Sequence, residues 1–130
     1  MYYIYKGYLM IHPQVGFLLF FVENPTTSAL FYEKILNLQP VQQSPTFVLF
    51  ALKNGVMLAF WSRYTAEPTV TAVPGAMEIS FSDEDIDGIY VEWLKLGVRI
   101  AQVPTEMDFG RTFVGLDPDG HRIRIYKLRD

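Results

Sequence analysis

Apolar positions in the first third of the chain form one continuous run, and a helical pattern follows it. Residues 15–22 are all apolar apart from one glycine, which is the length of a strand. Asn24 and Pro25 come shortly after this run. An Asn–Pro pair is typical of a helix start, because Asn caps free backbone N–H groups and proline suits the first helical turn. The pattern predicts a strand over residues 15–22 and a helix from Pro25 to about Asn37.

A hairpin and a linker complete the first half of the chain. Residues 47–52 and 56–61 are apolar runs on either side of Asn54 and Gly55. An Asn–Gly pair between two such runs indicates a two-residue type I′ turn. Residues 64–75 contain two prolines and several threonines, so we expect a linker there.

The second half repeats the order of the first. A predicted strand, a helix and three more strands occupy residues 76–81, 86–96, 98–103, 111–116 and 121–128. The distance from Phe17 to Asn24 is seven residues, and so is the distance from Glu78 to Asp85. This duplication predicts an α+β fold of two βαβββ modules. We place an N-terminal extension at residues 1–14, the first module at 15–63, the linker at 64–75 and the second module at 76–130.

The alternation of side chains along each strand predicts which residues meet the helices. One face of the second module carries the apolar residues Ile79, Phe81, Ile123 and Ile125. We expect the helical stripes that face the sheets to be Phe31, Ile35 and Leu38 in the first helix, and Ile86, Ile89, Tyr90, Trp93 and Leu94 in the second, with Gly97 ending it. The remaining strand face is polar in one module and apolar in the other.

That remaining face is the candidate binding surface. In the second module it carries Glu78, Ser80, Arg122, Arg124 and Tyr126. In the first module it carries Phe17, Leu19, Phe21, Met57, Ala59 and Trp61. An aromatic face of this size is unsuited to water, so we expect the modules to form a shared concave cavity with an apolar wall and a charged wall. The alternative is that the aromatic wall is ordinary core between two sheets.

Composition narrows the range of functions. Half of the 130 residues are apolar and 19% are charged, which excludes intrinsic disorder. The formal charge is −3 and no basic run occurs, so we expect no nucleic-acid partner. The absence of cysteine excludes disulfides, thiolate metal sites and a cysteine nucleophile. Because the N-terminus lacks a basic signal region and residues 15–22 are too short to span a bilayer, we expect a cytoplasmic protein with no membrane partner, and Met10 is an alternative start.

Several other residues have two interpretations. Trp61 stacks on a planar ligand or packs in a core or dimer contact. Residues 109–113, with Phe109 and Phe113 at their ends and Gly110 next to Phe109, follow a loop with Pro104. They form a lid over the cavity, or Phe109 is a simple loop anchor. The two histidines, His12 and His121, are expected in surface or turn positions. The acidic residues of positions 83–87 predict a solvated helix start rather than a calcium loop.

The order of these motifs resembles a known superfamily. Residues 24–32, 85–87 and 117–125 are similar to the glyoxalase, bleomycin-resistance and extradiol-dioxygenase superfamily, also called vicinal oxygen chelate, over about residues 15–127. Within it, residues 58–70 and 109–124 are similar to binding proteins for phenazine antibiotic resistance. The resemblance implies four metal-ligand positions, which here hold Phe17, Ala59, Glu78 and Arg124. Three of these cannot bind a divalent cation, so we expect no metal or cofactor, and an ion pair of Glu78 with Arg124 and Arg122 in its place.

We therefore expect a metal-free binding protein that sequesters a planar aromatic natural product, with or without a carboxylate, and so gives resistance to it. The resemblance implies a homodimer, with the cavity inside one chain or across two. One alternative is a lyase, isomerase or dioxygenase-like enzyme with Glu78 as its base or metal ligand, and another is an interaction module without a small ligand. The predicted ligand-binding residues are Phe17, Leu19, Phe21, Met57, Ala59, Trp61, Glu78, Ser80, Phe109, Phe113, Arg122, Arg124 and Tyr126.

Overall fold

The computed structural model describes residues 3–130, and their side chains from residue 6 onward. The first module consists of β3 (Phe17–Val22), α1 (Pro25–Leu36), β4 (Gln42–Gln43), β5 (Phe47–Ala51) and β6 (Met57–Ser62). The second consists of β7 (Glu78–Ser82), α2 (Ile86–Lys95), β8 (Arg99–Met107), β9 (Gly110–Leu116) and β10 (Arg122–Leu128). This order confirms the predicted α+β fold of two βαβββ modules.

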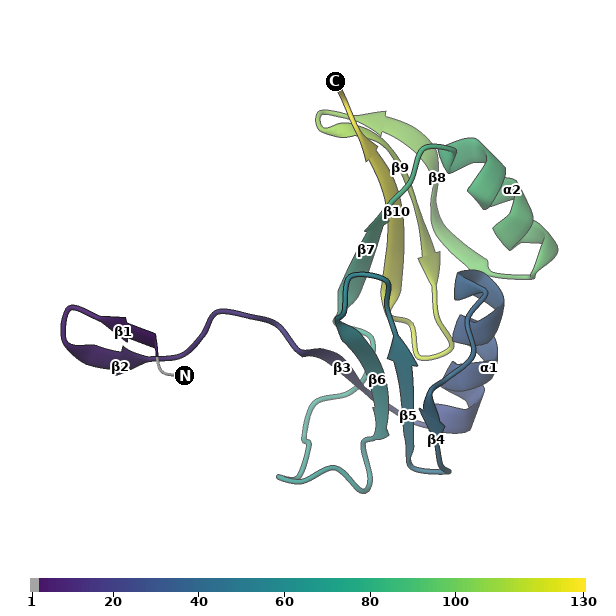
Figure 1. The fold of residues 1–130 in the computed structure, drawn as a ribbon. Coiled ribbons are helices and arrows are strands. Elements are labelled where there is room, and N and C mark those ends of the chain that lie inside the picture. Colours follow the sequence, from purple (N-terminus) through teal and green to yellow (C-terminus); the bar gives the residue numbers. More distant parts are fainter. Residues whose placement is uncertain (1–2) are drawn as a thin grey trace.

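Each module contains a four-stranded sheet with the same topology. The strand orders are β3-β6-β5-β4 and β7-β10-β9-β8. The first and last strands of each module pair in parallel, with Phe17 opposite Met57 in one sheet and Glu78 opposite Arg122 in the other. Both helices cover the same side of the molecule (Figure 1). The sheet surface on the opposite side carries no helix, and we call it the open face.

The helix-covered sides form the core. Its largest fully buried side chains in the first module are aromatic, namely Phe20, Tyr32, Phe50 and Phe60. The predicted stripe of α1 is only half-buried, because Tyr32 and the small residue Ala29 lie against the sheet. In α2, Ile86 and Trp93 are buried as predicted, but Leu94 is half exposed, so the expectation for Leu94 is wrong.

Helix α1 begins at a local hydrogen-bond cap. The Asn24 side chain accepts hydrogen bonds from the backbone N–H groups of Thr26 and Thr27, at 3.0 and 3.4 Å. We expect Asn24→Ala to lower the free energy of unfolding by about 1 kcal/mol, because it leaves these donors without their acceptor. Urea unfolding followed by circular dichroism measures the difference. Thr26→Ala is the control, and equal stability of Asn24→Ala and the unmodified chain would contradict the role of the cap.

Two local predictions are wrong. The β5–β6 turn is not type I′, because only Gly55 has a positive φ, of 86°, and Asn54 does not. The backbone N–H of Gly55 donates to the carbonyl of Leu52, as in a type I turn followed by one left-handed residue. The loop expected around Pro104 belongs to β8. This edge strand accommodates the proline where its pairing with β9 shifts register.

A buried polar cluster joins the two modules. Asp117, at the start of the β9–β10 turn, is fully buried and accepts a 2.9 Å hydrogen bond from the Tyr32 hydroxyl of α1. Nδ1 of His121 lies 3.0 Å from the same carboxylate oxygen, Oδ2. The other oxygen, Oδ1, accepts the backbone N–H groups of Asp119 and His121. The turn of the second module is therefore part of the first module's core.

The N-terminal residues form a hairpin that sequence analysis did not predict. Strand β1 (Tyr3–Tyr5) pairs with β2 (Tyr8–Met10), and the hairpin projects away from the two sheets (Figure 1). Its described side chains, among them Tyr8 and Leu9, are exposed. No helix among residues 3–130 is long and apolar enough to span a membrane.

Candidate functional site

The charged part of the open face is a cluster around Glu78. The Glu78 Oε2 atom lies 3.0 Å from Nε of Arg124, and Oε1 lies 2.9 Å from Nε of Arg122. The Ser80 hydroxyl donates to Oε2 at 3.2 Å. Parallel pairing of β7 and β10 creates this arrangement, because it places Glu78 opposite Arg122 and Ser80 opposite Arg124 on the same face. The expected ion pair is therefore present, and it includes both arginines.

The charges in this cluster do not cancel. Hydrogen bonds from Arg124 hold the pKa of Glu78 below its ordinary value, although partial burial acts in the opposite direction. Glu78 is therefore ionised at neutral pH. Two permanently charged guanidinium groups share this one carboxylate, so the cluster has a net charge of about +1.

Two polar residues that sequence analysis missed hold Arg124 in place. Its Nη1 group donates to Gln102 Oε1 of β8 and to Thr112 Oγ1 of β9, both at 3.3 Å. The fully buried Thr112 hydroxyl in turn donates to the carbonyl of Ile125. Thr112 could have been found from the alternation of β9, but the register shift in β8 hides Gln102 from such a pattern.

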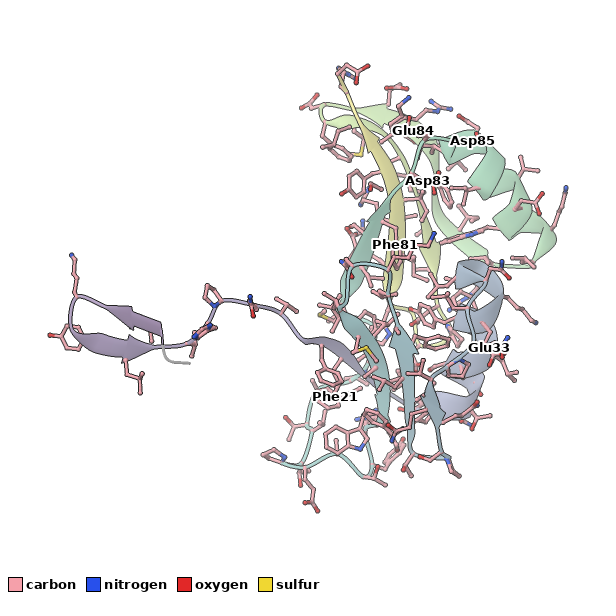
Figure 2. The ribbon with its side chains drawn as sticks, viewed as in Figure 1. Phe21, Glu33, Phe81, Asp83, Glu84 and Asp85 are labelled. Carbon is pink, nitrogen blue, oxygen red and sulfur yellow. The ribbon has the colours of Figure 1, made fainter. Side chains whose placement is uncertain are left out.

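The apolar part of the open face belongs to the first module. Phe17 is 55% exposed and Phe21 is 37% exposed, which are large exposures for phenylalanine. Figure 2 shows Phe21 on the side of the sheet that faces away from α1, and Glu33 on the opposite side, on the helix. Leu19 and Met57 are half-buried beside these residues, and Ala59 is fully buried between larger neighbours.

Trp61 is the centre of an aromatic group on this surface. Its ring centroid lies 6.3 Å from that of Phe21 and 6.1 Å from that of Phe47, which is opposite Trp61 in the antiparallel β5–β6 pair. Sequence analysis did not include Phe47. Alternation along β5 could have found it, because Val48 and Phe50 are the core positions of that strand. Within this group the Trp61 ring is half-buried, so part of it is accessible to a ligand from the open face.

Phe113 is a wrong prediction among the site residues. It is fully buried and lies on the helix side of β9, opposite the core residue Ile125. Its ring makes edge-on contacts with Tyr90 and Trp93, at centroid distances of 5.5 and 5.1 Å. The backbone alternation explains the error, because odd-numbered residues of β9 face α2. Phe109, by contrast, is 39% exposed in the turn between β8 and β9, and Tyr126 is half-buried on the open face.

The four positions that hold metal ligands in the superfamily do not fit a metal ion in this chain. Phe17 and Ala59 have no donor atom, and Arg124 is a cation. Glu78 is the remaining carboxylate, and both of its oxygens already contact arginine nitrogens. These four positions therefore offer a single carboxylate that is already bound to arginine, and they lack the several donor atoms that would chelate a metal ion.

A second group of potential ligand atoms lies outside the open face. Donor atoms of Asp117, Asp119 and His121 all lie within 4.8 Å of one another. The Asp117 carboxylate, however, already accepts hydrogen bonds on both oxygens, so the group acts as the module junction. His121 lies in the β9–β10 turn, one of the two expected positions, but it is buried there, whereas His12 is exposed. Burial was not predictable because the contact with Phe20 comes from the other module.

Two grooves lie elsewhere on the described chain. One, of about 360 Å³, lies between the start of α2 and the end of β10, near the acidic residues Asp83, Glu84 and Asp85 that Figure 2 labels. The other, of about 220 Å³, lies between α1 and the segment after α2. None of the predicted ligand-binding residues lines either groove. Those residues instead form the open face, with the exception of Phe113 in the core and Phe109 at the hairpin turn.

Known proteins resemble this chain in sequence and in fold. The family model for the Glyoxalase/Bleomycin resistance protein/Dioxygenase superfamily matches residues 14–125. The phenazine antibiotic resistance protein EhpR of Enterobacter agglomerans is 34% identical over 116 residues, which cover 85% of this chain and 88% of that protein. A protein from Agrobacterium tumefaciens, solved by solution NMR, is 40% identical with a TM-score of 0.80, over 93% of this chain and all of the other. A glyoxalase/bleomycin resistance protein/dioxygenase from Nocardioides shares the fold, with a TM-score of 0.80 at 19% identity over 93% and 87% of the two chains.

Proposed function

The chain belongs to the glyoxalase, bleomycin resistance protein and dioxygenase superfamily, and from this we propose that it binds a planar aromatic natural product on its open face, without a metal ion, and thereby gives resistance by sequestration. The observation that carries the proposal is the pairing of an exposed aromatic surface with a positively charged cluster on one face. The 34% identity to a phenazine antibiotic resistance protein supports phenazines as the ligand class.

The aromatic surface supplies the affinity in this proposal. Phe17, Phe21 and Trp61 expose ring surface, and burying apolar area contributes about 25 cal/mol per Å². An offset or edge-on contact with a flat ligand adds roughly 0.5–1.5 kcal/mol for each ring. The arginines fix the orientation of polar substituents.

Binding without a reaction is favoured over catalysis. An enzyme of this superfamily that used Glu78 as a base would need this carboxylate to accept a proton near neutral pH. The arginine contacts lower the pKa of Glu78 instead, which weakens it as a base. The same contacts occupy the oxygens that a metal ion would need.

A second copy of the chain would complete the cavity. A face with Phe17 more than half exposed is unusual for a monomer in water. We propose a homodimer in which two open faces enclose the ligand from both sides, so that the cavity lies across the two chains.

Titration of the purified chain with phenazine tests this function. We expect quenching of tryptophan fluorescence with saturation, and Trp61→Ala is expected to weaken binding about threefold to tenfold, because the stacking contact is lost. Leu30→Ala is the control, because Leu30 is exposed on the helix side. Elemental analysis of the same sample is expected to find no stoichiometric transition metal. Stoichiometric zinc, nickel, iron or manganese, or the absence of any saturable phenazine binding, would overturn the proposal.

A further inference from the structure

The two arginines of the open face differ in how far their hydrogen-bonding groups are occupied. They are two residues apart along β10 and point to the same side, and both contact Glu78. Sequence patterns treat them as equivalent candidates for holding an anionic group. Their surroundings in the folded chain separate them.

Arg124 is occupied by the protein. Its Nε and Nη2 groups donate to the two Glu78 oxygens at 3.0 and 3.4 Å, and its Nη1 group donates to Gln102 and Thr112. The guanidinium therefore uses four of its five N–H donors internally. Only 15% of the side chain is exposed. A ligand carboxylate could accept two hydrogen bonds from Arg124 only by displacing one of these partners, because a single N–H group remains.

Arg122 is occupied at one atom. Its Nε lies 2.9 Å from Glu78 Oε1, and 51% of the side chain is exposed. Among the described residues, no side-chain hydrogen bond engages its Nη1 or Nη2 groups. The outer edge of this guanidinium therefore presents a pair of N–H donors, which is the geometry that holds a carboxylate through two hydrogen bonds.

The charge of the cluster matches a single anionic group. Glu78 neutralises one guanidinium, and among the side chains described from residue 6 onward the second positive charge has no further partner of opposite sign on this face. A ligand with one carboxylate would restore neutrality, whereas a neutral ligand would leave the cation facing an apolar ring system. Charge complementarity of this kind favours one partner over another of the same shape.

Resting on the proposed function, we infer that Arg122 is the residue that selects carboxylated aromatic ligands over neutral ones, and that Arg124 is a positioning residue that fills the former metal site. Arg124 holds Glu78 in place, and Glu78 in turn directs Nε of Arg122. The ligand class is thereby narrowed from planar aromatics to planar aromatic monocarboxylates.

Calorimetric titration with phenazine-1-carboxylate and with unsubstituted phenazine tests this assignment in the full chain. In the unmodified protein we expect the acid to bind about tenfold more tightly than the neutral compound, with a preference that weakens as salt rises. Arg122→Gln is expected to bring the affinity for the acid down to about that for neutral phenazine, so that the preference is lost. Arg122→Lys, which keeps the charge but loses the planar fork, should keep part of the preference.

Two further variants show whether the preference depends on the position of Arg122 or only on the positive charge of the strand. Lys127→Gln removes one positive charge from the same strand, but Lys127 pairs with Glu84 on the other side, so the preference for the acid should be unchanged. Arg124→Gln is expected to lower the melting temperature and to weaken both ligands alike. An unchanged preference in Arg122→Gln, or loss of the preference in Arg124→Gln alone, would overturn the inference and leave the proposed function standing. Failure of both compounds to bind the unmodified chain would overturn the proposed function and the inference together.

Discussion

Replacement of Asp117 by alanine is expected to lower the free energy of unfolding by about 3–5 kcal/mol, the usual range when one member of a buried polar pair is removed. The carboxylate has no exposed surface, and it accepts hydrogen bonds on both oxygens. Its removal leaves the Tyr32 hydroxyl and two backbone N–H groups buried without an acceptor, and each such group has a cost of its own. Urea unfolding followed by tryptophan fluorescence and by circular dichroism measures the loss.

Tyr32→Phe is the graded control for this prediction. It removes one donor to Asp117 and keeps the ring that packs on Phe60 at a centroid distance of 4.4 Å. Burial raises the pKa of Tyr32 far above its ordinary value, so the hydroxyl keeps its proton and donates at all ordinary pH values. We expect a loss of about 1–2 kcal/mol from this variant. A loss below about 1 kcal/mol for Asp117→Ala would show that the junction adds little to stability.

The junction also predicts that the two modules unfold as one cooperative unit. Tyr32 comes from α1 of the first module, and Asp117 and His121 come from the last turn of the second module. The His121 ring lies edge-on to Phe20, in the core of the first module. Breaking the cluster therefore exposes core surface of one module and the turn of the other at the same time. We expect a single unfolding transition for both modules, since neither core is complete alone.

Strand and helix patterns predicted most of the fold because each element is specified locally. The Asn24–Pro25 pair fixed the start of α1, where the structure has the cap and the first helical residue. The seven-residue spacing that repeats at Phe17 and Glu78 predicted two equivalent modules. Local signals failed where tertiary contacts decide. The buried face of α1 is set by Tyr32, which the predicted stripe of Phe31, Ile35 and Leu38 did not indicate. Tyr32 is buried because its hydroxyl pairs with a residue 85 positions away.

The candidate site was predictable to the extent that it follows strand alternation. Glu78 and Arg124 meet as expected, because β7 and β10 pair in parallel and share a face. Alternation along β9 could have placed Thr112 beside Arg124, but it could not reveal Gln102, because β8 shifts its register against β9. It also could not rank the two arginines, since exposure and hydrogen-bond occupancy depend on neighbours outside β10. Residue type and spacing thus located the cluster, and packing decided the role of each member.

Phe113→Ala is expected to lower the free energy of unfolding by about 3–5 kcal/mol, because it leaves a cavity where the aromatic ring packs between α2 and the sheet. Phe113 has no exposed surface, and its ring contacts Tyr90 and Trp93. The melting temperature of a chain of this size should fall by roughly 10 °C or more. Differential scanning calorimetry measures this shift.

The same variant separates a core role from a role in ligand binding. At a temperature where Phe113→Ala is still folded, its affinity for phenazine should equal that of the unmodified chain, because the side chain lies on the helix side of β9. Trp61→Ala is the opposite case, since Trp61 is half-buried on the open face. Its replacement should weaken phenazine binding and lower the melting temperature less than Phe113→Ala does. A Phe113→Ala variant that kept its stability but lost phenazine binding would place this ring at the ligand and contradict its assignment to the core. Phe113→Ala and Trp61→Ala therefore separate stability from affinity, because the two side chains lie on different faces of their sheets.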